Sequence, residues 1–204
     1  MNFIKSDFSL TGNQKKYLED LAGKIKNIMP ASLYRHTINT LEFACSIAKK
    51  YLSDKEFFKL SIACILHDYG RMFDYEELMK IVREEKLKVS EFEMNCPPLL
   101  HSFVGEYLVR RDFDISDLKI LKAIRLHTIG SCSMGLLDKI LFIADKIEKD
   151  RNYEGVENLR NLAIVNINLC LLEVYKNNII YNIKKDKLLH PDTVKIWNNI
   201  CGGI

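Results

Sequence analysis

The sequence predicts an all-α fold in a single domain. Apolar residues recur at helical spacing along most of the 204 residues, and nothing resembles a run of alternating strands joined by Asn-Gly or Asp-Gly turns. The clearest irregular stretch is residues 86–97, which ends in Pro97-Pro98. No repeat, low-complexity segment or linker divides the chain. We therefore expect residues 1–204 to form one helical bundle.

Four helices are expected before the irregular stretch, and their ends carry recognisable signals. Pro30 stops the first helix and Ser53-Asp54 caps the third. Gly70 breaks that third helix just after the His67-Asp68 pair. The four expected helices are about Gly12–Met29, Ser32–Tyr51, Asp54–Leu66 and Tyr75–Glu85.

Four more helices are expected after the irregular stretch. They are about Pro98–Arg111, Ser116–Thr128, Gly135–Lys149 and Val156–Lys187. Helices of globular proteins typically run for about 8–20 residues, and the last of these is longer than that. We therefore expect the Val156–Lys187 segment to be a broken helix.

The composition is that of an ordinary globular protein. Hydrophobic residues make up 48% and charged residues 28%, with only 9 Gly and 4 Pro, which excludes a collagenous or disordered chain. The 30 Lys and Arg against 27 Asp and Glu leave a net charge of +3. This is too small and too evenly spread for non-specific nucleic-acid binding. We expect no nucleic-acid partner, and any bound anion must be held locally.

The sequence also predicts a cytoplasmic protein. Its first residues, MNFIKSDFSL, lack the apolar segment of a secretion signal. The most apolar stretches, such as Ser61–Leu66 and Leu136–Ala144, are short or interrupted by charge, so we expect no membrane span. Six scattered cysteines form no C-x-x-C pair and are interpreted as reduced thiols that pack as small apolar side chains.

A small set of histidines and aspartates is the informative part of the sequence. Its members are His36, His67, Asp68, His101, His127 and Asp145. His36 shares a helix face with Phe43 and Ile47, and His127 shares one with Ile120 and Ile124. We therefore expect these imidazoles to face inward.

The two aspartates follow apolar runs and need a partner if they are buried. Asp145 follows Ile140–Ala144, and a carboxylate removed from water costs several kcal/mol unless a cation or strong donors satisfy it. A metal ion would satisfy Asp68 and Asp145 together. The alternative is that the histidines are hydrogen-bonded core residues and that Asp145 pairs with Arg125 or Lys139. His190, before Pro191-Asp192, is interpreted as a capping or surface residue.

The order of these residues resembles the H…HD…D pattern of the HD-domain metal-dependent phosphohydrolases. The strings LHDYGR (66–71), LHSFVGEYLVR (100–110), AIRLHTIG (123–130), LLDKILFIADKIE (136–148) and RNYEGVENLRNLA (151–163) are similar to the YqeK-like HD family. The similarity runs from about residue 30 to Pro191-Asp192-Thr193. It implies a single HD domain whose motif-bearing core spans about 30–165, with C-terminal helices packing on it and a metal site inside.

The resemblance implies an activity and a set of metal ligands. The family cleaves diadenosine tetraphosphate symmetrically into two ADP and favours iron, although Mn, Co, Ni or Zn also suit imidazole and carboxylate ligands. We expect His36, His67, Asp68 and Asp145 to hold the principal ion. His101 and His127 are expected either to hold a second ion or to contact phosphate, which leaves one or two ions per chain open.

Several further residues are expected to contact the small nucleotide substrate. Arg71 and Arg151 match the family strings and can reach an anion held at the metal. The full set of nucleotide or phosphate contacts is Asn39, Arg71, Thr128, Lys146, Arg151 and Arg160. A homodimer is compatible with the sequence, which does not determine the oligomeric state.

Two other functions remain open at this point. The metal ligands do not encode the leaving group, so the chain could be a nucleotidase or a phosphodiesterase acting on a cyclic or alarmone nucleotide. It could also be a non-catalytic HD module that binds a nucleotide or a partner protein. The complete ligand set argues against this non-catalytic alternative.

Overall fold

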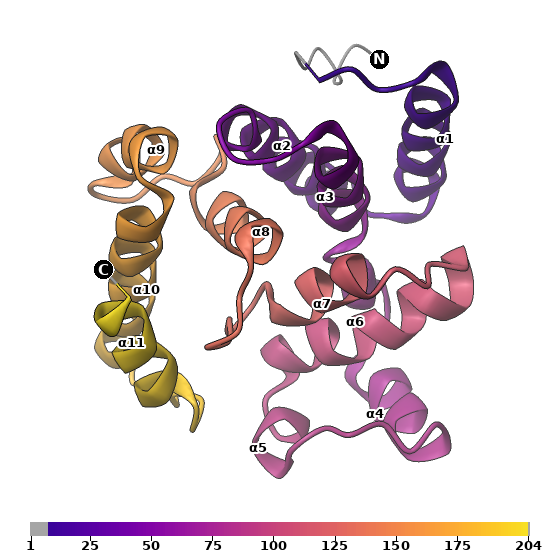
Figure 1. Cartoon of the computed structure of the whole chain (residues 1–204). Coiled ribbons are helices and arrows are strands. Elements are labelled where there is room, and N and C mark those ends of the chain that lie inside the picture. The colour runs from indigo at the N-terminus through magenta and orange to yellow at the C-terminus, as the bar shows by residue number, and fades with distance from the viewer. Residues whose placement is uncertain (1–7, 204) are drawn as a thin grey trace.

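The all-α prediction is confirmed. The computed structural model describes residues 8–203, and these residues form eleven α-helices and one short 3-10 helix, with no strand (Figure 1). The helices are α1 (Gly12–Ile28), α2 (Ala31–Ala48), α3 (Asp54–Leu66), η1 (Tyr69–Met72), α4 (Tyr75–Glu84), α5 (Glu91–Met94), α6 (Pro97–Phe113), α7 (Leu118–Leu126), α8 (Leu136–Ile147), α9 (Val156–Val165), α10 (Ile167–Lys184) and α11 (Thr193–Gly202). None of these helices is long and apolar enough to cross a membrane.

Helices α3 and α8 lie at the centre of the molecule. Their apolar residues are buried almost all round, with Phe57 in α3 and Phe142 in α8 among the largest fully buried side chains. Figure 1 shows α8 between α2, α7 and the pair formed by α9 and α10, while α4 and α5 lie beyond α6. Buried apolar residues from Leu18 in α1 to Ile196 in α11 belong to one hydrophobic cluster. Polar residues on α3 and α8 therefore lie in the interior of the molecule.

Side-chain caps in the local sequence explain where α3 and α10 begin. Ser53 accepts a hydrogen bond from the backbone N–H of Glu56 and so caps α3, as expected. The predicted break in the Val156–Lys187 segment is at Asn166, whose side chain accepts hydrogen bonds from the backbone N–H groups of Asn168 and Leu169. This cap starts α10 directly after α9 ends.

Two short helices differ from the sequence-based expectation. Residues 86–97 were expected to be irregular, but Ser90 and Glu93 form a reciprocal capping box that supports α5. Helix α11 lies beyond the last helix expected from the sequence. Its buried residues Thr193, Ile196 and Ile200 pack it on the core beside α10. The C-terminal segment therefore helps to cover α10.

Gly70 permits close backbone contact between η1 and α6. A Cβ atom at this position would lie 2.1 Å from the backbone oxygen of His101 and 3.0 Å from its carbonyl carbon. Helix α3 ends at Leu66, so the expectation of a break beside the His67-Asp68 pair is confirmed. The position requires glycine for this contact with main-chain atoms, which cannot move aside as a side chain can. The contact brings the chain segment of Asp68 against that of His101.

Candidate metal centre

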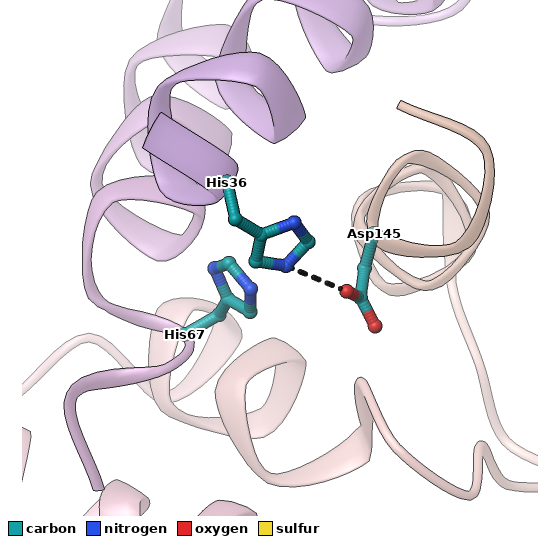
Figure 2. A group of neighbouring side chains, drawn as sticks. All are labelled: His36, His67 and Asp145. Carbon is teal, nitrogen blue, oxygen red and sulfur yellow. Dashed lines mark ion pairs between the residues drawn. The ribbon is translucent and has the colours of Figure 1, made fainter. Parts of the chain in front are cut away.

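The six histidines and aspartates singled out from the sequence come together in the interior. His36 lies on α2, His101 on α6 and Asp145 on α8. His67 and Asp68 directly follow α3, and His127 directly follows α7. The exposed side-chain fraction is at most 16% for any of the six. Figure 2 shows His36, His67 and Asp145 converging from three segments.

Asp68 lies between two groups of histidines. Its Oδ2 atom is 3.7 Å from Nε2 of His36 and 3.6 Å from Nε2 of His67. Its Oδ1 atom is 3.2 Å from Nε2 of His101 and 3.4 Å from Nε2 of His127. Asp145 completes the first group, because its Oδ1 atom is 3.0 Å from Nε2 of His36, as the dashed line in Figure 2 marks.

His67 provides the clearest indication that the cluster fits a metal ion. Its Nδ1 atom donates a hydrogen bond of 2.8 Å to the backbone oxygen of Cys64, which leaves a lone pair on Nε2. That Nε2 atom is buried and has no hydrogen-bond partner among residues 8–203. Ligand atoms of His36, His67 and Asp145 lie within 4.8 Å of one another, as do those of His67, Asp68 and His127. Imidazole and carboxylate donors in this arrangement suit a divalent transition metal.

The electrostatics of the cluster keep His67 neutral and both aspartates ionised. Burial lowers the pKa of His67 to about 4, so its imidazole is neutral at neutral pH. Burial alone would raise the pKa of Asp68, but the nearby His67 and the hydrogen bonds from His101 and His127 lower it well below its usual value. Burial opposes ionisation of Asp145 too, and Lys146 and His36 lower its pKa well below the usual range. Both carboxylates are therefore ionised.

Glu148 belongs to the site and was not singled out from the sequence. It is buried, with 2% of its surface exposed, and its Oε1 atom lies 3.2 Å from Nδ1 of His36. A carboxylate only accepts hydrogen bonds, so His36 donates from Nδ1 and presents Nε2 toward Asp68 and Asp145. The sequence feature that could have indicated Glu148 is its position three residues after Asp145, which places both carboxylates on one side of the chain.

Three predicted basic residues surround the cluster and contact its carboxylates. Arg71 Nε donates to Oδ1 of Asp68 at 2.8 Å, while half of the Arg71 side chain is exposed. Lys146 Nζ lies 2.9 Å from Oδ2 of Asp145 and from the backbone oxygen of His127. Arg151 donates to Asp145 through Nη2, and 42% of its side chain is exposed. These residues bring positive charge to the rim of the site.

The other three predicted nucleotide contacts have different surroundings. Arg160 donates to the backbone oxygens of Ile147, Glu148 and Arg151, so its guanidinium holds the end of α8. Thr128 follows His127, and its hydroxyl is 2.8 Å from that of Ser102. Asn39, one turn from His36, is buried with no partner for Nδ2 among the described residues. A nucleotide-binding role for the three residues stays a prediction.

The competing partners suggested for Asp145 are wrong. Arg125 pairs with Glu106, and Lys139 donates to the side chain of Asn168, so neither reaches the aspartate. His190 lies outside the cluster, as expected. Its Nε2 atom is 3.3 Å from Oε1 of Glu93, and its Nδ1 atom accepts from the backbone N–H of Asp192. This histidine joins the segment before α11 to α5.

Comparison with known proteins agrees with this geometry. The family model described as HD domain matches residues 33–150, a range that contains all six clustered residues. Two curated relatives are each named symmetrical bis(5'-nucleosyl)-tetraphosphatase. The relative from Bacillus subtilis is 35% identical over 91% of this chain and 98% of its own length. The relative from Halalkalibacterium halodurans is 38% identical over 82% of this chain and 88% of its own length.

A solved structure from Clostridium acetobutylicum has the same fold. It is described as a predicted HD superfamily hydrolase involved in NAD metabolism. It is 30% identical in sequence, with a TM-score of 0.84 over 91% of this chain and 97% of that one. The family match, the two curated relatives and this fold agree, and the chain therefore belongs to the HD domain family, in the branch that includes the symmetrical bis(5'-nucleosyl)-tetraphosphatases.

Proposed function

We propose that this protein is a metal-dependent hydrolase that cleaves diadenosine tetraphosphate symmetrically into two ADP. The observation that carries the metal dependence is the buried, unpartnered Nε2 atom of His67 among five other potential ligands. The names of the relatives from Bacillus subtilis and Halalkalibacterium halodurans support the substrate and the symmetrical products.

We assign the principal ion to His36, His67, Asp68 and Asp145, and we propose that it is iron. Mn, Co, Ni and Zn suit the same ligands. When bound, the ion supplies positive charge for phosphate oxygens and an acidified water as nucleophile. His101 and His127 face the second oxygen of Asp68, a position suited either to a second ion or to a phosphate oxygen.

The basic residues at the rim are proposed to hold the polyphosphate. Arg71 uses its Nε atom on Asp68, which leaves its terminal nitrogens for a phosphate oxygen. Arg151 and Lys146 are placed in the same way against Asp145. Each of these contacts between a basic residue and an aspartate fixes the orientation of a metal-ligating carboxylate. It also keeps a positive charge beside the reacting phosphate. The chain thus offsets the negative charge that repels a nucleophile from a polyphosphate.

The test is a product analysis on metal-loaded protein. The chain is purified with and without oxygen, its metal content is measured, and the products from a nucleotide panel are separated by chromatography. We expect diadenosine tetraphosphate to give ADP as the sole nucleotide product. Formation of ATP and AMP, or cleavage of a cyclic or alarmone nucleotide in its place, would overturn the substrate assignment while leaving the metal site intact.

The remaining assignments concern the state of the protein in the cell. The single hydrophobic cluster that runs from α1 to α11 supports one domain over residues 1–204. All six cysteines are free in the described residues, which supports a reducing, cytoplasmic location. A small nucleotide is the proposed partner, and neither nucleic acid nor membrane is expected. Sedimentation of the purified chain distinguishes a monomer from a homodimer.

A further inference from the structure

A cavity of about 340 Å³ lies between α6, α10 and the segment that joins α10 to α11. Its walls include apolar side chains from several segments and the side chains of two asparagines on α10. The residues that matter for the argument are Leu99, Thr128, Ile129, Asn178, Ile179 and Asn182. Pockets of about 300–1,000 Å³ with mostly apolar walls and a few polar groups typically bind small molecules.

Thr128 connects this cavity to the metal centre. It lines the cavity, and it is the residue after His127. Its hydroxyl is 2.8 Å from that of Ser102, which follows His101 on α6. Lys146 donates to the backbone oxygen of His127 and also contacts Asp145. The consecutive residues His127 and Thr128 therefore make the cavity a neighbour of the metal centre.

The cavity wall matches a purine base in its chemistry. Leu99, Ile129 and Ile179 offer apolar surface for the faces of an aromatic ring. Asn182 donates from Nδ2 to the backbone oxygen of Asn178 at 3.0 Å. The carbonyl oxygen of Asn182 and the amino group of Asn178 remain as an acceptor and a donor. Paired acceptor and donor groups of this kind recognise the amino group and ring nitrogen of adenine.

A second cavity near the site has the opposite character. It has a volume of about 490 Å³, is lined by Arg151, and takes its other residues mainly from polar and charged side chains after α8. Such walls favour an anion or water over an aromatic ring. Of these two cavities, only the one lined by Thr128 has both apolar walls and a hydrogen-bonding pair of side chains.

We propose that the cavity between α6 and α10 receives one adenosine of the substrate, with Asn178 and Asn182 reading the base. This inference rests on the proposed function, because the nucleoside enters the cavity while its phosphates lie at the metal centre. The two asparagines are specificity-determining residues in this arrangement. The apolar walls supply affinity for the nucleoside and none for a bare polyphosphate.

Blocking the cavity tests the proposal. Asn182→Trp places a bulky ring in it, and Asn177→Trp makes the same change at a neighbouring position of α10 that does not line it. Binding of ADP and of inorganic tripolyphosphate to the metal-loaded proteins is measured by calorimetry. We expect Asn182→Trp to weaken ADP binding by about tenfold or more, about 1.4 kcal/mol, while tripolyphosphate affinity changes by less than about twofold. Asn177→Trp should match the unmodified chain for both probes.

Two further readouts make the result decisive. Asn182→Ala keeps the cavity open and should weaken ADP by about three- to tenfold through loss of the amide. The KM for diadenosine tetraphosphate should rise in parallel in both Asn182 variants. Unchanged ADP affinity in both, or equal weakening of ADP and tripolyphosphate, would overturn the proposal. Failure of the unmodified chain to cleave diadenosine tetraphosphate would contradict the proposed function, whereas the ADP measurements test the cavity separately.

Discussion

The two groups of side chains on either side of Asp68 differ in how far they satisfy one another. His101 and His127 have their Nε2 atoms 3.1 Å apart, and each also approaches Oδ1 of the aspartate. On the other side, Nε2 of His67 has no hydrogen-bond partner in the described chain, although it is fully buried. A buried polar atom without a partner costs about 1–3 kcal/mol. The first group is therefore incomplete without a ligand, whereas the second forms contacts of its own.

This difference predicts that the two groups of side chains bind a metal ion with different affinities. The group that contains His67 gains the most from binding a cation, because the ion provides a partner for Nε2 of His67, which has no hydrogen bond in the folded chain. The His101 side must give up an internal contact to bind one. We expect the first position to fill before the second, and the following substitutions test that order.

Removal of His67 should have the largest effect. His67→Ala removes the unpartnered ligand, and we expect loss of the principal ion and a fall in hydrolysis of at least about a thousandfold, since metal catalysis contributes several kcal/mol. Metal analysis and steady-state kinetics measure the two effects, with circular dichroism to show that the helices persist. His190→Ala is the matched control for metal content alone, because His190 contacts Glu93 away from the cluster and also lines the cavity between α6 and α10. Retention of the ion and the rate by His67→Ala would refute the assignment.

Changes to the second group should leave the first ion in place. His101→Ala and His127→Ala are expected to lower kcat by about a hundredfold, within the range for loss of one group that acts directly on the reacting phosphate. Metal content per chain decides between the two roles, because a loss of about one ion from a two-ion protein indicates a second metal position. Loss of all metal in either variant would contradict the predicted order of filling. Unchanged kinetics in both would make these two histidines core residues.

Arg151 should matter for substrate and leave metal content unchanged. Arg151→Ala is expected to lower kcat/KM by about ten- to 150-fold, which corresponds to about 1.5–3 kcal/mol for a hydrogen bond to a charged group. Arg83→Ala on α4 removes an exposed arginine elsewhere and serves as the control. If Arg151→Ala lost its metal, the main task of this arginine would be to hold Asp145.

Glu148 should affect the metal through His36. Glu148→Ala is expected to weaken binding of the principal ion by about ten- to a hundredfold, the usual effect of removing a group that orients a ligand histidine. Glu148→Gln keeps an acceptor for Nδ1 of His36 and should bind the ion with an intermediate affinity. Titration with Co²⁺, followed by its visible absorption, reports both affinity and coordination.

A second variant separates this effect from general loosening of the fold. Glu42→Ala removes an exposed ion pair of 2.7 Å between α2 and Lys149, close to the end of α8, without touching His36. Its Co²⁺ affinity should equal that of the unmodified chain. Equal weakening in Glu42→Ala and Glu148→Ala would attribute the effect to the packing of α2 on the end of α8.

The helices and the six clustered residues were predictable because their signals are local or carried by a motif. Apolar spacing located the main helices, and the breaks at Gly70 and within residues 156–187 followed from helix-ending residues and length. The short helix α5 was not predicted, because one capping box in an otherwise polar stretch produces little periodicity of apolar residues. Helix α11 was not predicted because it is only ten residues long, and the burial of its apolar residues depends on packing against α10.

The contacts around the cluster were less predictable because they depend on packing between distant segments. Glu148 resembles a solvent-facing charge in the sequence until α2 places His36 beside it. Arg160 resembles a phosphate ligand until its donors are found on the carbonyl groups at the end of α8. Such residues are separated in the chain by up to 112 positions from the groups that they contact.

The backbone contact at Gly70 has a consequence for mutational tolerance. We expect single replacements of the side chains at the metal centre to leave a folded chain whose metal content can be measured. Gly70 differs, because even a methyl group would meet the main chain of His101 at 2.1 Å. In a library that samples all residues at every position, this glycine should accept no replacement, and changes of metal preference should arise at the surrounding side chains.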